Sequence, residues 1–277
     1  SSLHATTVAY YEFDATGTAA VGSTVVDSSG NAHHGTVMGG ALLYGTDPLV
    51  DGYMHFDADA GSTNNPCNRV EVPGAADLVF TTDQTYTFEA IFRTTQITTN
   101  GVILSKGCDV SNPDSQWWVR HRGDGRVHGL VEGTDNTTED SASSATGSTF
   151  NDGEWHHVAL VFDGTQLTKR LDLYVDGILR GSDTAIGTAG LIGGEDTDPV
   201  MFGEYASFAG NRSFAGDIAA IRLSDTALTP SEFLPVGKTY LSDVFPTNKA
   251  SFLPAGTVAS FVVNSPYIGV PATNVQV

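Results

Sequence analysis

The stretch Asp152–Gly164, DGEWHHVALVFDG, and its continuation Leu171–Leu179, LDLYVDGIL, decide the fold of this chain. In both runs apolar residues recur at every second position, which is the period of a β-strand. The sequence therefore predicts two neighbouring antiparallel strands. The pair Asp176-Gly177 predicts a tight hairpin after them, because such a turn needs residues that tolerate positive φ. A third short strand, Ile178–Arg180, completes a meander.

The rest of the chain repeats this pattern of short strands joined by polar turns. The run Tyr86–Arg93, YTFEAIFR, alternates well, so we expect one face to pack and the other to be wet or to bind a ligand. Thr134–Asn151 is polar and is expected to be a long surface loop or a weakly ordered edge. Because helical periodicity is almost absent, the chain is predicted to be all-β.

Length and composition suit one large β domain or two smaller ones. The chain has 277 residues, of which 40% are hydrophobic and 16% are charged, so it can bury a sizeable core. No apolar run approaches the roughly 20 residues of a membrane span. The character changes near residue 236. We therefore expect one domain over 1–236, and over 237–277 a linker with the start of a second β domain or tail strands that exchange with another molecule.

The charge balance excludes two classes of partner. The net charge is −19, from 13 Lys and Arg against 32 Asp and Glu. Such a surface repels phosphate backbones and anionic lipids, so we expect no nucleic-acid partner and no membrane insertion. An acidic surface poor in lysine suits an extracellular or high-salt solution, and carboxylates clustered in turns favour calcium.

Two cysteines, Cys67 and Cys108, stand in polar surroundings rich in turn residues. An even number of cysteines fits a disulfide in an oxidising compartment, whereas a cytosolic protein more often places a lone cysteine in apolar surroundings. The sequence therefore predicts a bridge between Cys67 and Cys108.

Eight segments of the chain resemble one known family in order and spacing. They are YYEFD, VVDSSGNAHHGTV, RVEVPG, YTFEAIFR, ILSKG, DGEWHHVALVFDG, LYVDG and FAGDIAAIRL, between Val8 and Leu234. Together they resemble the laminin-G-like, concanavalin-A-like jelly-roll domains. The resemblance implies a two-sheet antiparallel β-sandwich, often with a calcium ion, in a mostly extracellular family of binding and adhesion modules. A minority of the wider superfamily are glycosidases or polysaccharide lyases.

A calcium site is predicted in the DSSGN turn. Calcium takes several oxygen ligands at once, and the turn offers Asp27, Asn31 and backbone carbonyls. The resemblance implies that Asp217, from the last long strand, lies close to this turn. Asp27, Asn31 and Asp217 are the predicted ligands. The alternative is structural, with Asp27 capping its own turn and Asp217 binding backbone amides.

A sugar-binding face is predicted around one tryptophan. Sugars stack on aromatic rings while their hydroxyls meet fixed polar groups. Trp117 and Trp118 are adjacent, so one faces the core and the other the opposite surface. The predicted ligand-binding residues are Trp118, Arg120, His128, Glu132 and Tyr205. The alternative is ordinary packing beneath a scattered polar surface.

Zinc binding and catalysis are not expected. His156 and His157 are adjacent in a strand, so their side chains point to opposite faces and cannot hold one ion together. The E-x-D-x-x-E pattern of the glucanases in this superfamily is absent. Glu12 and Asp14 could face the same way but lie on an edge strand. Neither a Ser-His-Asp nor a phosphate-binding glycine signature appears.

The sequence therefore predicts an extracellular, non-catalytic recognition module that binds carbohydrate and carries a structural calcium. The first alternative is an adhesion or assembly module that binds protein partners and lends its tail strands to a neighbour. A polysaccharide hydrolase or lyase is the lesser alternative.

Overall fold

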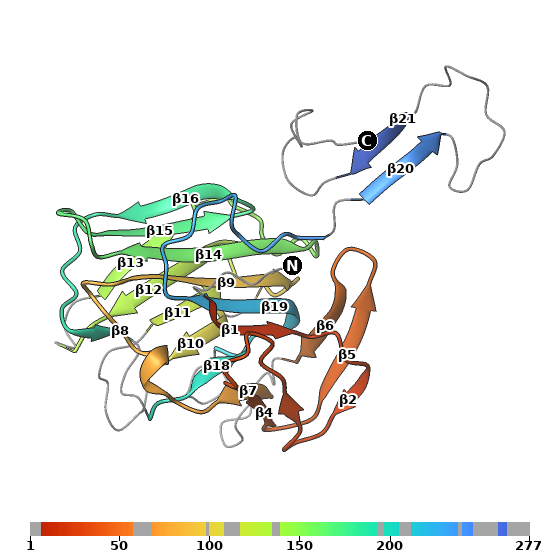
Figure 1. Cartoon of the computed structure of the whole chain (residues 1–277), viewed down its shortest axis with the longest axis horizontal. Helices are drawn as coiled ribbons and strands as arrows, with labels where there is room; N and C mark the ends of the chain where they lie inside the picture. Colours follow the sequence, from red (N-terminus) through yellow and green to blue (C-terminus); the bar gives the residue numbers. More distant parts are fainter. Residues whose placement is uncertain are drawn as a thin grey trace.

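The protein is a β-sandwich (Figure 1). The computed structural model describes residues 7–57, 68–97, 100–107, 117–134, 139–192, 197–204, 212–237, 240–245 and 260–264. Two large antiparallel sheets lie face to face, and the described residues contain one short 3-10 helix, η1 (Ala76–Leu78). The predicted all-β sandwich is confirmed.

We call the larger sheet A. From one edge to the other, its strands are β16 (Ile178–Asp183), β15 (Arg170–Val175), β14 (His156–Asp163), β9 (Thr85–Arg93), β19 (Gly216–Ser224), β6 (Asp51–Phe56), β5 (Leu42–Asp47) and β2 (Gly17–Ala19). A ninth strand, β1 (Thr7–Glu12), also pairs with β19, so the first strand is joined to the last strand of the sandwich.

We call the second sheet B. Its strands run in the order β13 (Glu139–Ser143), β12 (Val127–Glu132), β11 (Trp117–His121), β10 (Gly101–Lys106), β18 (Val200–Phe202), β7 (Arg69–Val72), β4 (Gly35–Met38) and β3 (Thr24–Val25). Two small sheets pair β8 (Phe80–Thr81) with β17 (Leu191–Ile192), and β20 (Tyr240–Phe245) with β21 (Ser260–Asn264).

The meander predicted from the sequence forms one side of sheet A. Strand β14 pairs with β15, which pairs with β16, and Val175 lies opposite Ile178 across the turn. Asp176 and Gly177 have φ angles of 54° and 71°. Positive φ at both positions gives the backbone twist that a two-residue hairpin needs. The predicted loop or edge at Thr134–Asn151 contains β13, the edge strand of sheet B.

The core lies between the two sheets, and stacked aromatic rings dominate its centre. Phe88 of sheet A lies 3.9 Å, between ring centroids, from Trp117 of sheet B. Tyr86 stacks on Phe88 at 4.8 Å and on Phe162 at 4.9 Å. These side chains are fully buried, so the inward face of YTFEAIFR packs as predicted. Such pairs add to the stability that the buried apolar area provides.

A segment after β19 crosses the outer face of sheet A. We call residues 225–237 the crossing segment. Its Leu228 and Phe233 pack on Ala159 and Val161 of β14. Its Leu234 packs beside Ile91 of β9. Much of the outer face of sheet A is therefore covered.

A buried charge cluster fixes the crossing segment. Glu89 is 0% exposed and accepts hydrogen bonds from His157 (3.0 Å), from Arg222 Nε (2.6 Å) and from the backbone N–H of Leu234 (2.9 Å). Arg222 also donates to the carbonyl of Glu232 at 2.7 Å. One carboxylate thus joins two strands of sheet A to the segment that covers them.

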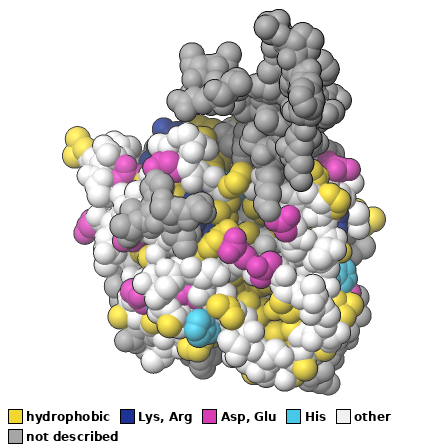
Figure 2. All heavy atoms as spheres, turned by 45° about the vertical axis from the view of Figure 1, so that its right-hand side comes forward, with side chains coloured by type: hydrophobic (Ala, Val, Ile, Leu, Met, Phe, Trp, Pro, Cys, Tyr) yellow, Lys and Arg dark blue, Asp and Glu magenta, His cyan; other side chains and the backbone are white. Residues whose placement is uncertain are grey.

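The surface is acidic where the figures show it. On the face in Figure 2, Asp and Glu side chains predominate over Lys and Arg. This agrees with the net charge of −19. Among the described residues, no helix has the length and apolar character needed to cross a membrane.

Two predictions fall wholly or partly outside the described residues. Cys67 and Cys108 both lie outside them, so the disulfide stays a prediction. Of residues 238–277, only β20 and β21 are described, and each pairs only with the other among the described strands. The domain boundary near residue 236 likewise stays a prediction.

The cluster around Glu89 makes a prediction about stability. Glu89→Gln should lower the free energy of unfolding by about 3 kcal/mol, because it leaves the Arg222 charge buried without its partner. Urea denaturation followed by tryptophan fluorescence measures the loss. Asp83→Asn is the control, since it breaks the exposed Lys169–Asp83 pair and should cost below about 1 kcal/mol. Equal losses in the two variants would contradict the role given to Glu89.

Candidate functional site

Three of the sequence-predicted sugar-binding residues, Trp118, Arg120 and His128, contact one another on the outer face of sheet B. The guanidinium of Arg120 lies 4.2 Å from the centroid of the Trp118 ring, and the His128 ring meets it edge-on at 4.9 Å. Arg120 and His128 are also hydrogen-bonded at 3.1 Å. Glu132 lies on the same strand as His128 at an even spacing and therefore on the same face. Tyr205 lies outside the described residues.

These side chains are packed against one another. Trp118 is only 4% exposed, and it packs with Val102 and Leu130. Burial, with smaller contributions from nearby arginines, lowers the pKa of His128 to about 4, so its ring is neutral at pH 7. Trp118 therefore offers no open ring face for a sugar to stack on. This arrangement favours the packing alternative, and a sugar-binding role for this set stays a prediction.

The DSSGN turn is held by hydrogen bonds to Asp27. Its Oδ1 accepts from the backbone N–H groups of Tyr10 (2.9 Å) and Ser29 (2.8 Å). Its Oδ2 accepts from the Ser29 hydroxyl (2.8 Å) and the N–H of His33 (2.9 Å). Burial alone would raise the pKa of Asp27, but these hydrogen bonds outweigh burial and hold the pKa below its usual value.

The three predicted calcium ligands are engaged with other groups of the protein, and calcium binding by them stays a prediction. Asn31 donates its amide N–H to the carbonyls of Thr7 and Val8, which ties the turn to β1. Asp217 pairs instead with residues of β6 and β9. Calcium needs oxygen atoms with free lone pairs, and each oxygen of Asp27 already accepts two hydrogen bonds. Among the described residues, no three His, Cys, Asp or Glu side chains gather as metal ligands would.

The two adjacent histidines of β14 point to opposite faces, as predicted. His157 is buried against Glu89 under the crossing segment. His156 lies between two carboxylates, 2.9 Å from Asp176 and 3.1 Å from Asp152. The contact between His156 and Asp152 holds the turn that precedes β14.

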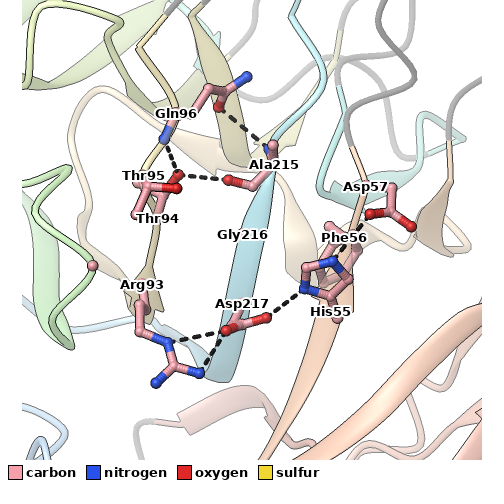
Figure 3. A pocket seen from close by; sticks show the side chains of 11 residues that line it. His55, Phe56, Asp57, Arg93, Thr94, Thr95, Gln96, Ala215, Gly216 and Asp217 are labelled. Carbon is pink, nitrogen blue, oxygen red and sulfur yellow. Dashed lines mark hydrogen bonds and ion pairs between the residues drawn. The ribbon is translucent and has the colours of Figure 1, made fainter.

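A pocket of about 300 Å³ opens beside the ends of β6, β9 and β19. We call it the His55 pocket (Figure 3). Its lining combines polar and charged side chains with apolar surface, and the residues are His55, Phe56, Asp57, Arg93, Thr94, Thr95, Gln96, Gly153, Ala215, Gly216 and Asp217. Three of these residues lie opposite one another across neighbouring strands, because Asp217 pairs with both His55 and Arg93 in the sheet register.

A chain of charged hydrogen bonds forms one wall of the His55 pocket. Asp217 accepts from Arg93 at 2.7 Å and 3.0 Å, and its other oxygen lies 2.6 Å from Nδ1 of His55. Nε2 of His55 lies 3.0 Å from Asp57. Arg93 also donates to Asp47 at 3.0 Å. In Figure 3 these groups run in a row from β9 through β19 to β6.

Aromatic rings hold Arg93 from behind. Its guanidinium carbon lies 4.4 Å from the centroid of the Trp155 ring and 5.2 Å from that of Tyr53. The two rings lie 5.6 Å apart. Cation–π contacts and three charged hydrogen bonds leave Arg93 little freedom. The wall is therefore organised before any ligand arrives.

The pKa shifts of His55 and Asp47 both favour the charged form of the side chain. The hydrogen bond to Asp217 is the main cause that raises the pKa of His55, and it outweighs the opposing effect of burial. Burial would raise the pKa of Asp47, but hydrogen bonds and the charge of Arg93 lower it. Hydrolysis of a glycosidic bond needs one carboxyl kept protonated near neutral pH, and Asp47 is shifted the opposite way.

The His55 pocket offers hydrogen-bonding groups rather than a reactive one. Asp57 is 72% exposed on its side chain and keeps acceptor capacity beyond its bond to His55. The imidazole of His55 is 40% exposed. Gly216 allows close packing at this end of the sheet, because a Cβ there would clash with the backbone oxygen of Arg93 and with the ring of Phe214. This arrangement can bind a small polar molecule in a fixed orientation.

A larger hollow of about 540 Å³ lies between β1, the β5–β6 turn and the crossing segment. Its floor is apolar, formed in part by Ile91, Ala219 and Ala220. Arg222, which lines it, is committed to Glu89. The His55 pocket has the more complete set of fixed polar groups and is the candidate site.

Sequence reasoning identified one residue of this pocket and missed the others. Asp217 was predicted as a calcium ligand, whereas its two oxygens bind Arg93 and His55. The alternation of YTFEAIFR places Arg93 on the face expected to be wet or to bind. His55 lies in a run whose alternation also predicts a strand. The sequence carries no signal for the strand order, which brings β6, β19 and β9 together.

The sequence matches a profile of the concanavalin A-like lectin/glucanases superfamily over residues 67–233. No curated protein sequence matches the chain. The matched range includes β7 to β19 and therefore both sheets.

Several solved structures share the fold. Domain 4 of AbnA, a GH43 extracellular arabinanase from Geobacillus stearothermophilus in complex with arabinotriose, is 19% identical, with a TM-score of 0.58, over 82% of this chain and 96% of that one. The binding domain of Paraclostridial Mosquitocidal Protein 1 is 15% identical, with a TM-score of 0.57, over 82% and 50%. The binding domain of Botulinum Neurotoxin DC, in complex with SialylT, is 11% identical, with a TM-score of 0.57, over 83% and 50%.

The contacts of His55 and His156 with carboxylates predict how the stability of the fold depends on pH. Burial lowers and two carboxylates raise the pKa of His156, with a net rise, and that of His55 is raised too. Both groups therefore stabilise the fold fully below their unfolded pKa of about 6.5 and lose this contribution as pH rises through the folded pKa. Relative to His156→Gln, the wild type should lose stability as the pH rises above about 6.5, measured by urea denaturation.

His128 is a control with a pKa shift in the opposite direction to that of His156. Its lowered pKa means that it destabilises the fold as pH falls from about 6.5 towards 4. His128→Gln should therefore remove a loss of stability on the acid side only. A wild type and His156→Gln variant with parallel stability curves above pH 6 would contradict the bridging role of His156.

Proposed function

Because this chain belongs to the concanavalin A-like lectin/glucanase superfamily, we propose that it is a non-catalytic recognition module that binds oligosaccharide in the His55 pocket. The supporting observation is the wall of fixed polar groups that runs from Arg93 through Asp217 to His55 and Asp57. Sugar hydroxyls need donors and acceptors held at set positions, and groups fixed before binding lose little entropy.

The pocket lies at an open end of a covered face. The crossing segment occupies the middle of the outer face of sheet A through Phe233 and Leu234. A long polysaccharide therefore cannot lie along the whole face. We propose that the pocket takes a short stretch of a chain, or a chain end.

The absence of catalysis is part of the proposal. The carboxylates of the wall, Asp47 and Asp217, are both bound to Arg93. Asp57 lies 3.0 Å from Nε2 of His55. None of these carboxyls stands in the apolar surroundings that would keep it protonated as a general acid.

We propose an extracellular setting, consistent with the acidic surface.

The calcium prediction can be tested directly. The sequence pattern predicts that EDTA lowers the melting temperature and that added calcium restores it. The hydrogen bonds of Asp27 predict an unchanged melting temperature, because N–H and O–H donors already satisfy the carboxylate. Thermal melts in EDTA and in calcium chloride decide between the two.

An assembly role is the second candidate. The observation that favours it is the separate sheet of β20 and β21, which pairs with no other described strand. Open edges of a two-stranded sheet can pair with another chain. Light scattering on the full chain and on residues 1–236 tests this role. Assembly that persists without residues 237–277 would contradict it.

Thr95→Tyr tests the proposed binding site. Thr95 is exposed and lines the His55 pocket, so a tyrosine ring should fill part of the space and weaken oligosaccharide binding by at least about tenfold. A glycan array identifies ligands, and calorimetry on the strongest gives the affinities. Thr168→Tyr is the control, because Thr168 is exposed in the turn after β14, at the end of sheet A opposite to Arg93. Equal affinity in Thr95→Tyr and the wild type would exclude this pocket.

A further inference from the structure

The charged side chains that line the His55 pocket leave no excess of positive charge. They are Arg93 and, when protonated, His55 against the carboxylates Asp57 and Asp217. Asp47, which pairs with Arg93 but does not line the pocket, adds a third carboxylate nearby. Loss of the His55 proton leaves the lining with one net negative charge. The chain as a whole adds a net charge of −19.

Each cation of the wall is already engaged. Arg93 lies between Asp47 and Asp217, at 3.0 Å and 2.7 Å, with its flat face on Trp155. Both ring nitrogens of His55 face carboxylates, at 2.6 Å and 3.0 Å. A carboxylate or sulfate on a ligand would have to displace one of these partners, and the displaced aspartate would be left unpaired.

The most exposed group of the wall is an acceptor. The side chain of Asp57 is 72% exposed, compared with 13% for Asp217. An incoming hydroxyl can donate to Asp57, whereas an incoming carboxylate meets a like charge. Like charges set against each other at an interface weaken binding.

We infer that the His55 pocket selects neutral oligosaccharides against acidic ones, and that Asp57 is the specificity-determining residue. This inference rests on the proposed function of the same pocket. Uronic acids, sialic acids and sulfated sugars are the excluded class, and hydroxyl-rich neutral sugars are the accepted class.

The test uses three forms of one ligand. The first is a neutral oligosaccharide that the array identifies. The second is its uronate, made by oxidising its primary hydroxyls. The third is the methyl ester of that uronate, which restores neutrality at nearly the same size. Calorimetry with the wild-type chain at 50 mM salt should give about tenfold weaker binding for the uronate, and the ester should recover most of the loss.

Variants and salt then assign the effect to charge at Asp57. Asp57→Asn should reduce the ratio of the ester's affinity to the uronate's affinity, called the gap below, by at least about threefold. Asp77→Asn is the matched control, because Asp77 is also exposed and pairs with a histidine, His33, at 2.9 Å outside the pocket. The gap should also shrink at 500 mM salt, where the Debye length is about 4 Å.

The outcomes separate the two proposals. If the uronate binds as tightly as the ester and Thr95→Tyr still blocks both, the selectivity is refuted while the binding site stands. If the gap persists unchanged in Asp57→Asn, Asp57 is not the discriminating residue. If no oligosaccharide binds, or Thr95→Tyr blocks none, the proposed function fails and the inference fails with it.

Discussion

The hydrogen bonds that converge on Glu89 determine what the outer face of sheet A can do. This carboxylate joins β9, β14 and β19 to the crossing segment. Without it, the segment would have to cover a buried arginine that has no counter-ion. Because the segment is held over the middle of the sheet, polar groups remain accessible at one end. The crossing segment, held by Glu89, therefore leaves the His55 pocket uncovered.

Arg93 plays the corresponding part at the pocket itself. It is the last residue of β9, where the strand leaves the sheet, and its side chain packs on Trp155 and Tyr53. Its partners Asp47 and Asp217 come from β5 and β19. A single guanidinium therefore fixes three strand ends. The same contacts that stabilise this end of the sheet also orient the groups that face solvent.

Local sequence predicted much of the fold because strands and turns carry their own signals. Alternation identified β9, β14 and β15, and the Asp176-Gly177 turn formed as expected. Strand β13 was harder, since EDSAS contains one buried alanine and no large apolar residue. The site was harder still. Asp217 could be recognised as unusual, but its partners His55 and Arg93 lie 162 and 124 residues away, and only the sheet order brings them together.

The pairing of β1 with β19 has a consequence for biosynthesis. Residues as early as Tyr11 find their partner only at Ile221. A ribosome must therefore release nearly the whole sandwich before the central strands of the larger sheet can close. Until then β9 lacks β19, one of its two neighbouring strands, and its aromatic side chains remain partly exposed to solvent. Contacts so distant in sequence slow folding, so the apolar faces of a nascent chain of this design stay exposed for longer than those of a helical bundle of equal length.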